Sequence, residues 1–544
     1  MKIALAQLNY HVGNFAANVL KIKNTIRKAK ECQADIVVFA ELSVCGYPPR
    51  DFLEFSDFIE QCHNGIDEIA CECTGIAAII GAPGINPNEK GKPLFNSAYF
   101  LAEGKVWAIR HKSLLPNYDV FDEYRYFEPN RNFEVINYHD QKIALTICED
   151  LWNIDNDPLY TVTPMDVLSD QRPTMMINIA ASPFHYNQDA VRKSVLTRNA
   201  QKYGLPLVYV NHVGAQTELI FDGGSLVVDK NGNISSELSY FEEDFKIIDI
   251  DEKTADTGYS GTKADKIQWI HDALVLGIHD YFGKMGFQKA ILGLSGGIDS
   301  AVTLALASQA LGNKNCLAVL LPSRFSSNHS VNDARLLAEN LNVSYHIISI
   351  EEAYKSLENT LQPYFAGLPF GLAEENVQAR IRAVILMALS NKFGYILLNT
   401  SNKSEAAVGY GTLYGDMCGG LSVLGDVYKT DVFALARYLN RNGEIIPENT
   451  IIKPPSAELR PGQKDSDSLP EYSILDRILF QYIEERKSPR ELIDAGFDET
   501  IVRKVLRMVN TNEWKRYQTP PILRTSPKAF GMGRRMPIVG KYLF

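Results

Sequence analysis

The sequence has no long apolar run. Hydrophobic residues make up 45% of its 544 residues, but no stretch approaches the roughly 18 apolar residues that a membrane-spanning helix requires. The amino-terminal segment MKIALAQLNY contains an apolar stretch that Gln7 interrupts, and this is too short for the hydrophobic region of a secretory signal. We therefore expect a soluble, cytoplasmic protein with no membrane partner.

Cysteine is scarce, with 8 residues in the chain, and no two of them have CxxC spacing. Disulfide frameworks and structural zinc sites need several Cys or His residues at short, regular spacings. Cys71 and Cys73 form a lone CxC pair, and the 10 histidines are scattered. The sequence therefore favours a reducing compartment, and neither a disulfide framework nor a structural zinc site is expected.

Positive charge is in deficit. Lys and Arg number 55 against 65 Asp and Glu, a net charge of −10 at pH 7. A general nucleic-acid binder needs the opposite balance, because it must neutralise phosphates, so no nucleic-acid partner is expected. The 22% of charged residues is ordinary for globular proteins, which excludes disordered and fibrous classes. At about 150 residues per domain, the length indicates three or four domains or two large ones.

The first half of the chain contains short apolar runs of the kind that form buried strands. Residues 18–32 predict a helix, because Val19, Ile22 and Ile26 fall on one face. Together these predict an α/β domain with a central sheet over residues 1–255. The predicted strands cover residues 3–8, 36–40, 77–82, 143–147, 175–181, 207–210 and 225–228.

A polar stretch, IDIDEKTADTGYSGTK at residues 248–263, lacks apolar periodicity and predicts a boundary between two domains. Beyond it, over residues 262–544, predicted strands and helices alternate. This order indicates right-handed βαβ units and a parallel sheet with helices on both faces. The predicted strands are 290–294, 317–321, 345–349 and 395–399, and the predicted helices are 266–281, 300–311, 331–341, 374–391 and a pair near 475–485 and 489–509.

Three reactive residues stand just past apolar runs: Glu41 after DIVVFA, Lys112 after VWAIRH and Cys148 after KIALTI. The carboxyl ends of strands are where sites assemble in open α/β sheets. A free thiol has a pKa of about 8.5 and attacks well only as the thiolate. Glu41 can take the proton, and Lys112 can stabilise the thiolate and then an oxyanion. The alternative is that Cys148 is an inert core thiol.

Three segments around these residues, FAELSVCGYPPRD, RHKSLLPNYDVFDEYRYF and LTICEDLW, resemble signatures of the nitrilase (carbon–nitrogen hydrolase) superfamily. The resemblance implies a sandwich of two sheets with outer helices, in the order α-β-β-α. It also implies that a Glu41–Lys112–Cys148 triad attacks an amide, and that Glu123 in FDEYRYF orients the lysine. Cys45 is the rival thiol, and we rank it below Cys148.

The resemblance also suggests how a substrate is held. In glutamine-using members of the superfamily, the positions of Tyr118 in NYDVFDE and Ser182 in ASPFHYN contact glutamine. Gln188 in HYNQDA occupies a further position of this kind. These three residues are the expected glutamine-binding set, with a packed loop aromatic as the alternative for Tyr118.

The segment GLSGGIDS joins the predicted strand KAIL to a predicted helix. Gly296 and Gly297 lack Cβ atoms, so backbone N–H groups can close around phosphate oxygens at a helix N-terminus. Ser295 and Ser300 add hydroxyls, and Asp299 is placed to hold Mg²⁺. The GK[ST] ending of kinases and GTPases is absent. The segment instead resembles the pyrophosphate loop of the ATP pyrophosphatases, which implies adenylation of a carboxylate or carbonyl oxygen with release of pyrophosphate.

Six further segments resemble the NAD synthetase family over nearly all of residues 262–544. The chain departs from the family pattern at Leu413, where ammonia-using members carry a lysine, and at Gly420, where an acidic residue is usual. No substrate contact is therefore expected at either position. The segments are ENVQARIR, LLNTSNKSE, YGTLYGD, LGDVYKTD, PPSAELRPGQKDSDSLPEY and EWKRYQTPP.

Carried across by position, Asn376, Arg380 and Lys515 are implied to contact the dinucleotide substrate, nicotinic acid adenine dinucleotide (deamido-NAD). A solvated helix face is the alternative for Arg380, as it is for Arg382. Glu405 is implied to share the metal and the substrate end, which makes Asp299 and Glu405 the expected Mg²⁺ ligands. The expected ATP-binding residues are Gly293, Leu294, Ser295, Gly296, Gly297, Ile298, Asp299, Ser300, Thr400 and Lys429.

Together the two resemblances imply a glutamine-dependent ligase that uses ATP and Mg²⁺. Glutamine hydrolysis would release ammonia through a Cys148 thioester, and ATP would adenylate the nicotinate carboxylate of deamido-NAD. Ammonia would then displace AMP and form NAD. Because ammonium is not a nucleophile, a sheltered route for ammonia between the domains is expected. A closed homo-oligomer is the default expectation for such an enzyme.

Two alternatives remain open at this point. The first is an ammonia-only synthetase whose nitrilase-like half is a docking module without turnover. The second is another ATP pyrophosphatase ligase, acting on a purine or a tRNA base, against which the acidic charge balance and the segments from ENVQARIR to EWKR both count. A pure nucleotide-binding or scaffold protein would leave the thiol triad unexplained.

Overall fold

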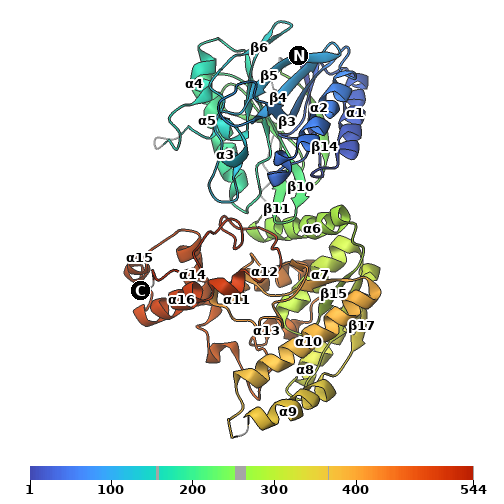
Figure 1. The fold of residues 1–544 in the computed structure, drawn as a ribbon, viewed down its shortest axis with the longest axis vertical. Coiled ribbons are helices and arrows are strands. Elements are labelled where there is room, and N and C mark those ends of the chain that lie inside the picture. The colour runs from blue at the N-terminus through green and yellow to red at the C-terminus, as the bar shows by residue number, and fades with distance from the viewer. Residues whose placement is uncertain (155–157, 251–264, 366, 543–544) are drawn as a thin grey trace. The chain divides into compact units, whose positions relative to one another are not determined.

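The computed structural model describes residues 1–154, 158–250, 265–365 and 367–542. The chain divides into two compact units, Met1–Lys263 and Ala264–Phe544 (Figure 1). Most of the polar stretch that predicts a domain boundary, residues 251–263, lies outside the described residues. None of the helices within the described ranges has the combined length and apolar character that crossing a bilayer demands.

The first unit contains two six-stranded sheets. The first sheet has the order β14-β1-β2-β3-β4-β5, in which β1, β2 and β3 run parallel and the outer pairs are antiparallel. The pattern of apolar runs does not predict β4, because polar side chains interrupt its middle, although all nine of its residues are buried. The strands of this first sheet are β1 (Lys2–Gln7), β2 (Ile36–Val38), β3 (Ala77–Ile85), β4 (Leu94–Ala102), β5 (Lys105–His111) and β14 (Asp244–Asp249).

The second sheet has the order β13-β12-β9-β8-β7-β6, with β7, β8 and β9 parallel. A separate antiparallel hairpin of β10 (Val213–Gln216) and β11 (Leu219–Asp222) follows β9. The strands of the second sheet are β6 (Ile136–Tyr138), β7 (Gln141–Ile147), β8 (Met175–Ala180), β9 (Leu207–Asn211), β12 (Leu226–Val228) and β13 (Ile234–Glu237).

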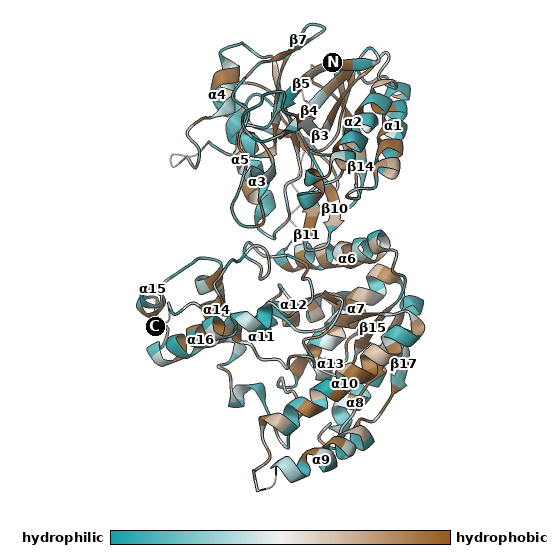
Figure 2. Cartoon of the chain, in the orientation of Figure 1, coloured by the Kyte–Doolittle hydropathy of each residue, from teal (hydrophilic) through white to brown (hydrophobic). Residues whose placement is uncertain are grey.

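Alternation along β1 shows how the layers pack. Ile3 and Leu5 join a core that includes Ile177 of the second sheet, whereas Ala4 faces the opposite side, where Ile22 of α1 packs. Figure 2 shows the strands of this unit as mostly hydrophobic between amphipathic helices. The layers are therefore helix, sheet, sheet, helix, which confirms the implied sandwich. The covering helices are α1 (Phe15–Glu31), α2 (Ser56–Ala70), α4 (Pro164–Ser169) and α5 (Gln188–Tyr203), and a short α3 (Glu123–Tyr126) follows β5.

The second unit has one five-stranded parallel sheet of order β17-β16-β15-β18-β19. Its first strand in the chain, β15, lies in the middle, so the chain leaves β15 toward one edge and later returns to its other side. In doubly wound sheets ligands bind at this reversal, beyond the carboxyl ends of the strands. The strands are β15 (Ala290–Gly293), β16 (Cys316–Leu320), β17 (Ser344–Ile347), β18 (Ile396–Asn399) and β19 (Leu421–Ser422).

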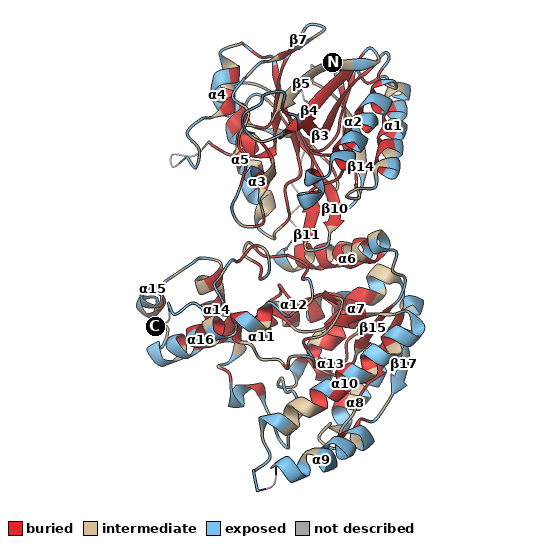
Figure 3. Ribbon diagram, in the orientation of Figure 1, coloured by how far each residue is buried: buried red, intermediate tan, exposed pale blue. Residues whose placement is uncertain are grey.

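Helices cover both faces of this sheet, as predicted. Ile291 and Val319 share a core with Ile381 of α10, so the alternate residues of β15 and β16 face the opposite layer of helices. Figure 3 shows the central strands buried and the edge strand β17 largely exposed, and α9 and part of α10 are exposed as well. These helices are α6 (Lys266–Met285), α7 (Ile298–Leu311), α8 (Asn328–Asn340), α9 (Glu351–Phe365), α10 (Leu372–Phe393) and α12 (Lys429–Leu439).

The carboxyl-terminal region forms a helical subdomain around a separate apolar cluster. One predicted helix, residues 489–509, is in fact two helices, because Gly496 adopts φ +94° and ends the first of them. The remaining helices are α11 (Lys403–Val408), α13 (Glu448–Ile452), α14 (Tyr472–Ile483), α15 (Pro489–Asp494), α16 (Glu499–Thr511) and α17 (Glu513–Arg516).

Candidate functional sites

Cys148 is the first residue after β7 and begins a short 3₁₀ turn, Cys148–Leu151. Its backbone has φ +42°, an uncommon conformation for a residue with a side chain. Asp150 supports this turn: its carboxylate accepts hydrogen bonds from the backbone N–H groups of Ile147, Ser113 and Leu114. Asp150 thus ties the turn that holds Cys148 to the segment that directly follows Lys112.

Lys112 lies between two carboxylates. Its Nζ donates to Oε1 of Glu41 at 2.7 Å and to Oε1 of Glu123 at 2.8 Å, and its side chain is 0% exposed. Glu41 also accepts from the backbone N–H of Ala181 at 3.0 Å. Burial opposes the charge of Lys112, but the carboxylates of Glu123 and Glu41 outweigh it and hold the pKa of Lys112 well above its ordinary value. The lysine is therefore an ammonium throughout the physiological range.

The same environment keeps Cys148 protonated until a base acts. Burial and the charge of Glu41 raise the pKa of the Cys148 thiol well above its usual value, while Lys112 opposes this rise. A nucleophile in this position needs a base beside it, and the Glu41 carboxylate has the chemistry to act as one. The three residues reach one place from β2, β5 and β7, which belong to two different sheets. Their chemistry suits acyl transfer through a thioester.

The residues expected to bind glutamine form two separate hydrogen-bonded groups. The Tyr118 hydroxyl donates to Oε1 of Glu149 at 2.8 Å, and the Tyr160 hydroxyl donates to the same atom at 3.1 Å. Gln188 Nε2 donates to Oγ of Ser182 at 3.3 Å. Glu149 did not enter the expected set, although its place directly after Cys148 was a signal for it.

Cys45, the rival thiol, is packed in the core. Its side chain is fully buried in a cluster that includes Leu42 and Tyr47, and its Sγ lies 3.7 Å from the carbonyl oxygen of Leu42. Burial raises the pKa of Cys45 well above its usual value. Its surroundings are those of a structural thiol.

In the second unit, the phosphate-loop candidate runs from the end of β15 into α7. Gly296 has φ +80°, and a Cβ at this position would lie 2.1 Å from the carbonyl oxygen of Ser330. Ser300 Oγ donates to the carbonyl of Gly297 at 3.0 Å, and the N–H of Gly297 donates to Ser295 Oγ at 3.1 Å. Only glycine fits at position 296, because any side chain would collide with the start of α8.

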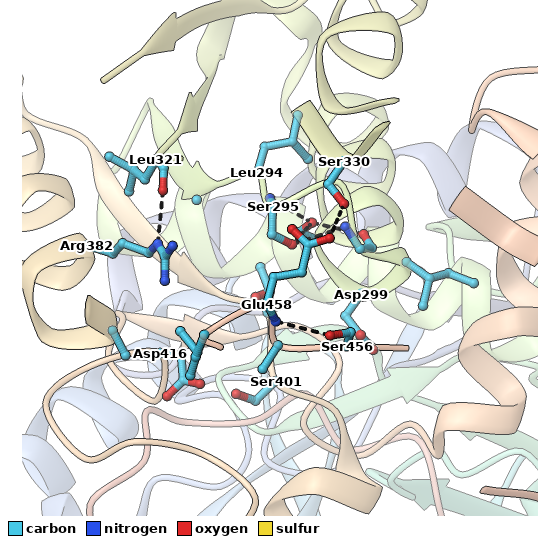
Figure 4. A pocket seen from close by; sticks show the side chains of 18 of the residues that line it. Leu294, Ser295, Asp299, Leu321, Ser330, Arg382, Ser401, Asp416, Ser456 and Glu458 are labelled. Atoms are coloured by element: carbon cyan, nitrogen blue, oxygen red, sulfur yellow. Dashed lines mark hydrogen bonds between the residues drawn. The ribbon is translucent and has the colours of Figure 1, made fainter. Parts of the chain in front are cut away.

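This loop borders a cavity of about 310 Å³ at the reversal of the strand order (Figure 4). The cavity brings together residues from β15, β18 and α12 that are far apart in the sequence. Of the expected ATP-binding and metal residues, those that line it are Gly293, Leu294, Ser295, Gly297, Ile298, Asp299, Ser300, Thr400, Glu405 and Lys429.

The ammonium group of Lys429 lies between Asp299 and Glu405, the two expected Mg²⁺ ligands. Lys429 Nζ donates to Oδ2 of Asp299 at 2.5 Å and to Oε1 of Glu405 at 3.2 Å, and Asn402 Nδ2 donates to the other Asp299 oxygen at 2.8 Å. Burial raises the pKa of Glu405, while Lys429 opposes the rise. Carboxylates suit Mg²⁺, which is often held by one or two of them together with substrate phosphates. Across the described ranges, no group of three or more His, Cys, Asp or Glu side chains is arranged as metal ligands.

The three remaining dinucleotide-binding candidates meet at one loop, residues 409–413, beside this cavity. Asn376 Oδ1 accepts from Thr412 Oγ1 at 2.7 Å, and Arg380 Nε donates to the carbonyl of Leu413 at 3.2 Å. Lys515 Nζ donates to the carbonyls of Gly409 and Gly411. These three residues do not line the cavity itself, and Arg380 is exposed.

Five charged residues that line the cavity are absent from the expected set: Arg382, Asp416, Lys453, Glu458 and Asp465. Arg382 Nε donates to the carbonyl of Leu321 at 3.0 Å, and burial lowers the pKa of Arg382 to about 10. Glu458 accepts from Oγ of Ser327 and of Ser330 at 2.9 and 2.8 Å (Figure 4). Arg382 and Glu458 both fall in segments that carry the family resemblance. Arg382 therefore lines the cavity and does not lie on a solvated helix face, the alternative given for it above.

Two family comparisons match the chain. The carbon-nitrogen hydrolase family matches residues 2–259, and the NAD synthase family matches residues 270–519. A glutamine-dependent NAD(+) synthetase of Synechocystis sp. is 45% identical over 98% of this chain and 98% of the relative. The enzyme of the same name from Acinetobacter baylyi is 42% identical over 99% of this chain and 98% of its own length. The similarity is full-length and includes both candidate sites.

Solved structures agree. The structure of glutamine-dependent NAD+ synthetase from Acinetobacter baumannii in complex with adenosine diphosphate has a TM-score of 0.78 and 39% sequence identity, with 99% of both chains covered. A glutamine-dependent NAD(+) synthetase from Cytophaga hutchinsonii has a TM-score of 0.84 at 22% identity, with 99% of this chain and 98% of that chain covered. The second similarity supports the fold.

Replacing Glu41 by Gln is expected to make Cys148 easier to alkylate. The substitution removes a negative charge that raises the pKa of the thiol, so more thiolate should be present at a given pH. The rate of iodoacetamide addition to the Cys148 peptide, followed by mass spectrometry against pH, measures this. Glu68→Gln, which changes an exposed carboxylate of the same unit, is the control. A profile that stays in place or moves to higher pH would contradict the charge arrangement.

Replacing Gly296 by Ala is expected to weaken ATP binding at least tenfold, because the new Cβ must displace the Ser330 backbone and distort the loop. Isothermal titration calorimetry gives the dissociation constant. Gly312→Ala is the matched control, since Gly312 has a similar φ of +84° but nothing within 4 Å of its Cβ position. Equal affinities in the two variants would show that the loop geometry is not needed for nucleotide binding.

Proposed function

This chain belongs to the family of glutamine-dependent NAD(+) synthetases, and from that premise we propose what each of its two sites does. The reaction of the family joins nitrogen from glutamine to deamido-NAD in an ATP-dependent step that forms NAD. The observation that carries our assignment is the buried Lys112 between Glu41 and Glu123 in the same chain as a GLSGGIDS loop. One unit hydrolyses glutamine, and the other activates the acid that receives the nitrogen.

In the first site, Glu41 accepts the proton of Cys148 as the sulfur attacks the glutamine amide carbon. Lys112 stabilises the thiolate and then the oxyanion of the tetrahedral intermediate. Glu41 returns the proton to the leaving nitrogen, so ammonia departs and a thioester remains, which water hydrolyses with Glu41 again as the base. Tyr118, Ser182 and Gln188 hold the glutamine.

In the second site, an oxygen of the nicotinate carboxylate attacks the α-phosphorus of ATP. An adenylate forms and pyrophosphate leaves, and ammonia then displaces AMP to give the amide. The loop from Gly293 to Ser300 and Lys429 stabilise the negative charge of the phosphates, because their N–H, hydroxyl and ammonium groups surround the cavity. Asn376, Arg380 and Lys515 hold the dinucleotide at the 409–413 loop.

Mg²⁺ is part of the proposal for this site. Asp299 and Glu405 are the residues that would hold it, and their carboxylate oxygens fit its preference for hard oxygen ligands. When bound, the ion neutralises phosphate charge and makes phosphorus a better electrophile. The ion pairs of Lys429 with both carboxylates support a site that accepts positive charge.

The second unit also offers a surface for self-association. Val384, Met387 and Phe393 of α10 are apolar but exposed, Val384 by 68% and Phe393 by 57%. Val384 and Met387 are three residues apart, so they share one side of the helix. A homo-oligomer in which a second copy covers these residues of α10 accounts for their exposure. We also place the enzyme in the cytoplasm, in line with its eight free cysteines.

Cys148→Ala is expected to abolish NAD formation from glutamine and to preserve NAD formation from ammonium. The substitution removes the nucleophile of one site and leaves the other untouched. AMP and NAD are quantified after incubation with Mg-ATP, deamido-NAD and either nitrogen source. Cys45→Ala is the matched control and should use both sources. Use of ammonium alone by the wild type would make the first unit a docking module, and no NAD from either source would remove the proposed role of the second unit.

The double substitution Val384→Lys and Met387→Lys is expected to lower the oligomeric state, because it places two ammonium groups in the proposed contact between copies. Sedimentation velocity at a fixed concentration gives the mass of each species. Leu20→Lys is the control, since Leu20 is similarly exposed on α1 of the other unit. An unchanged mass in the double variant would move the contact away from this face of α10.

A further inference from the structure

Asn96 is a buried polar residue of β4 that none of the roles above uses. Its side chain is fully buried. Its backbone carbonyl accepts from the N–H of Lys112 at 2.8 Å, one step beyond the pairing of Ser97 with His111. The register of β4 against β5 therefore sets Asn96 directly opposite Lys112, where the two side chains share one face of the sheet.

The Asn96 amide bridges the same two carboxylates that Lys112 bridges. Nδ2 donates to Oε1 of Glu41 at 2.7 Å and to Oε2 of Glu123 at 3.3 Å. Its carbonyl oxygen, Oδ1, is buried and has no partner among the described residues. The opposite orientation of the amide would point that oxygen at two carboxylates, so the electrostatics fix the nitrogen toward them. An unpaired buried carbonyl is costly, and here it is the consequence of satisfying two anions.

Each of the two carboxylates accepts three hydrogen bonds from other described residues. Glu41 accepts from Lys112, Asn96 and the N–H of Ala181, and Glu123 accepts from Lys112, Asn96 and the hydroxyl of Tyr47. Such surroundings stabilise negative charge on the two side chains, because each of these hydrogen bonds points a donor at a carboxylate oxygen. Lys112 supplies one positive charge for two negative ones, and Asn96 supplies the second bridge.

The charges that face this pair come from several elements. Burial raises the pKa of Glu123, and the charge of Lys112 and the hydrogen bond from Tyr47 oppose this rise. Burial lowers the pKa of His111, on β5, to about 4, so His111 adds no charge near pH 7. The other titratable groups that interact with the two carboxylates or with Lys112 are Tyr47, Cys148, Glu149, Asp150 and Tyr160.

We propose that Asn96 is a positioning residue of the glutaminase site. Its amide nitrogen holds the carboxylates of Glu41 and Glu123 in place on either side of Lys112, and so keeps Glu41 oriented to accept the proton of Cys148. The inference rests on the proposed roles of Glu41 and Cys148. Asn96 acts through the two carboxylates and touches neither the nucleophile nor the substrate. Its loss should therefore alter how activity depends on pH more than how tightly glutamine binds.

The test is the pH profile of kcat/KM for glutamine hydrolysis in the full-length Asn96→Leu variant. Leucine has a similar size and no donor. We expect the acidic limb to move to higher pH by about one unit, a tenfold change in the protonation equilibrium, with KM at the plateau within about twofold of wild type. Asn18→Leu is the matched control: Asn18 is also buried and donates to two carbonyls, those of His11 and Val44, so the acidic limb should stay in place.

Asn96→Ser keeps one hydroxyl donor and should shift the acidic limb by less than the leucine variant, which also covers the case in which Asn96→Leu fails to fold. Ammonium-dependent NAD formation shows whether the second unit is intact in each variant. A uniform loss of activity at every pH, with the acidic limb of both Asn96 variants unmoved, would overturn the proposal. If the proposed catalytic triad is wrong, Cys148→Ala will still hydrolyse glutamine. This result distinguishes an error in the triad from an error in the role of Asn96.

Discussion

The first unit depends on one buried ammonium. Lys112 is completely enclosed, and removing such a charge from water costs several kcal/mol before any partner is counted. The cost is offset only because Glu41 and Glu123 lie at hydrogen-bond distance on either side. Each of the three residues comes from a different segment of the chain. The ion triplet therefore requires that β2, β5 and α3 be in their native places, and the catalytic geometry is inseparable from the fold.

The second unit also holds a buried lysine between two carboxylates, but beside a cavity. Lys429 is buried between Asp299 and Glu405, but these carboxylates line a cavity that the phosphate-loop candidate borders. The glycine loop after β15 adds neutral N–H donors, which stabilise anions without requiring a counter-ion. The first site thus encloses its charges, while the second site keeps its charges in a cavity where a substrate can reach them. This difference matches acyl transfer to a thiol in the first site and adenylation in the second.

Much of both sites could be predicted from sequence, for a specific physical reason. Glu41, Lys112 and Cys148 each follow an apolar run, and the residues from Gly293 to Ser300 stand at a strand-to-helix junction, so local patterns mark them. Asn96 escaped prediction because β4 is buried on both faces and its polar residues look like interruptions. Arg382 was not predicted because Arg380 and Arg382 lie two positions apart on one helix. Only the packing of that helix places Arg382 at the cavity and leaves Arg380 exposed.

The sequence by itself determined the α/β class, the order of the strands that precede each reactive residue and the phosphate-loop chemistry, because these depend on residues close together in the chain. Only the tertiary structure decided which carboxylates meet which lysine. The triad joins strands of two different sheets, and its charge balance depends on Asn96, which strand register places opposite Lys112. Register and sheet packing are properties of long-range pairing, and no local pattern encodes the distance between two side chains that are 71 residues apart, as Lys112 and Glu41 are.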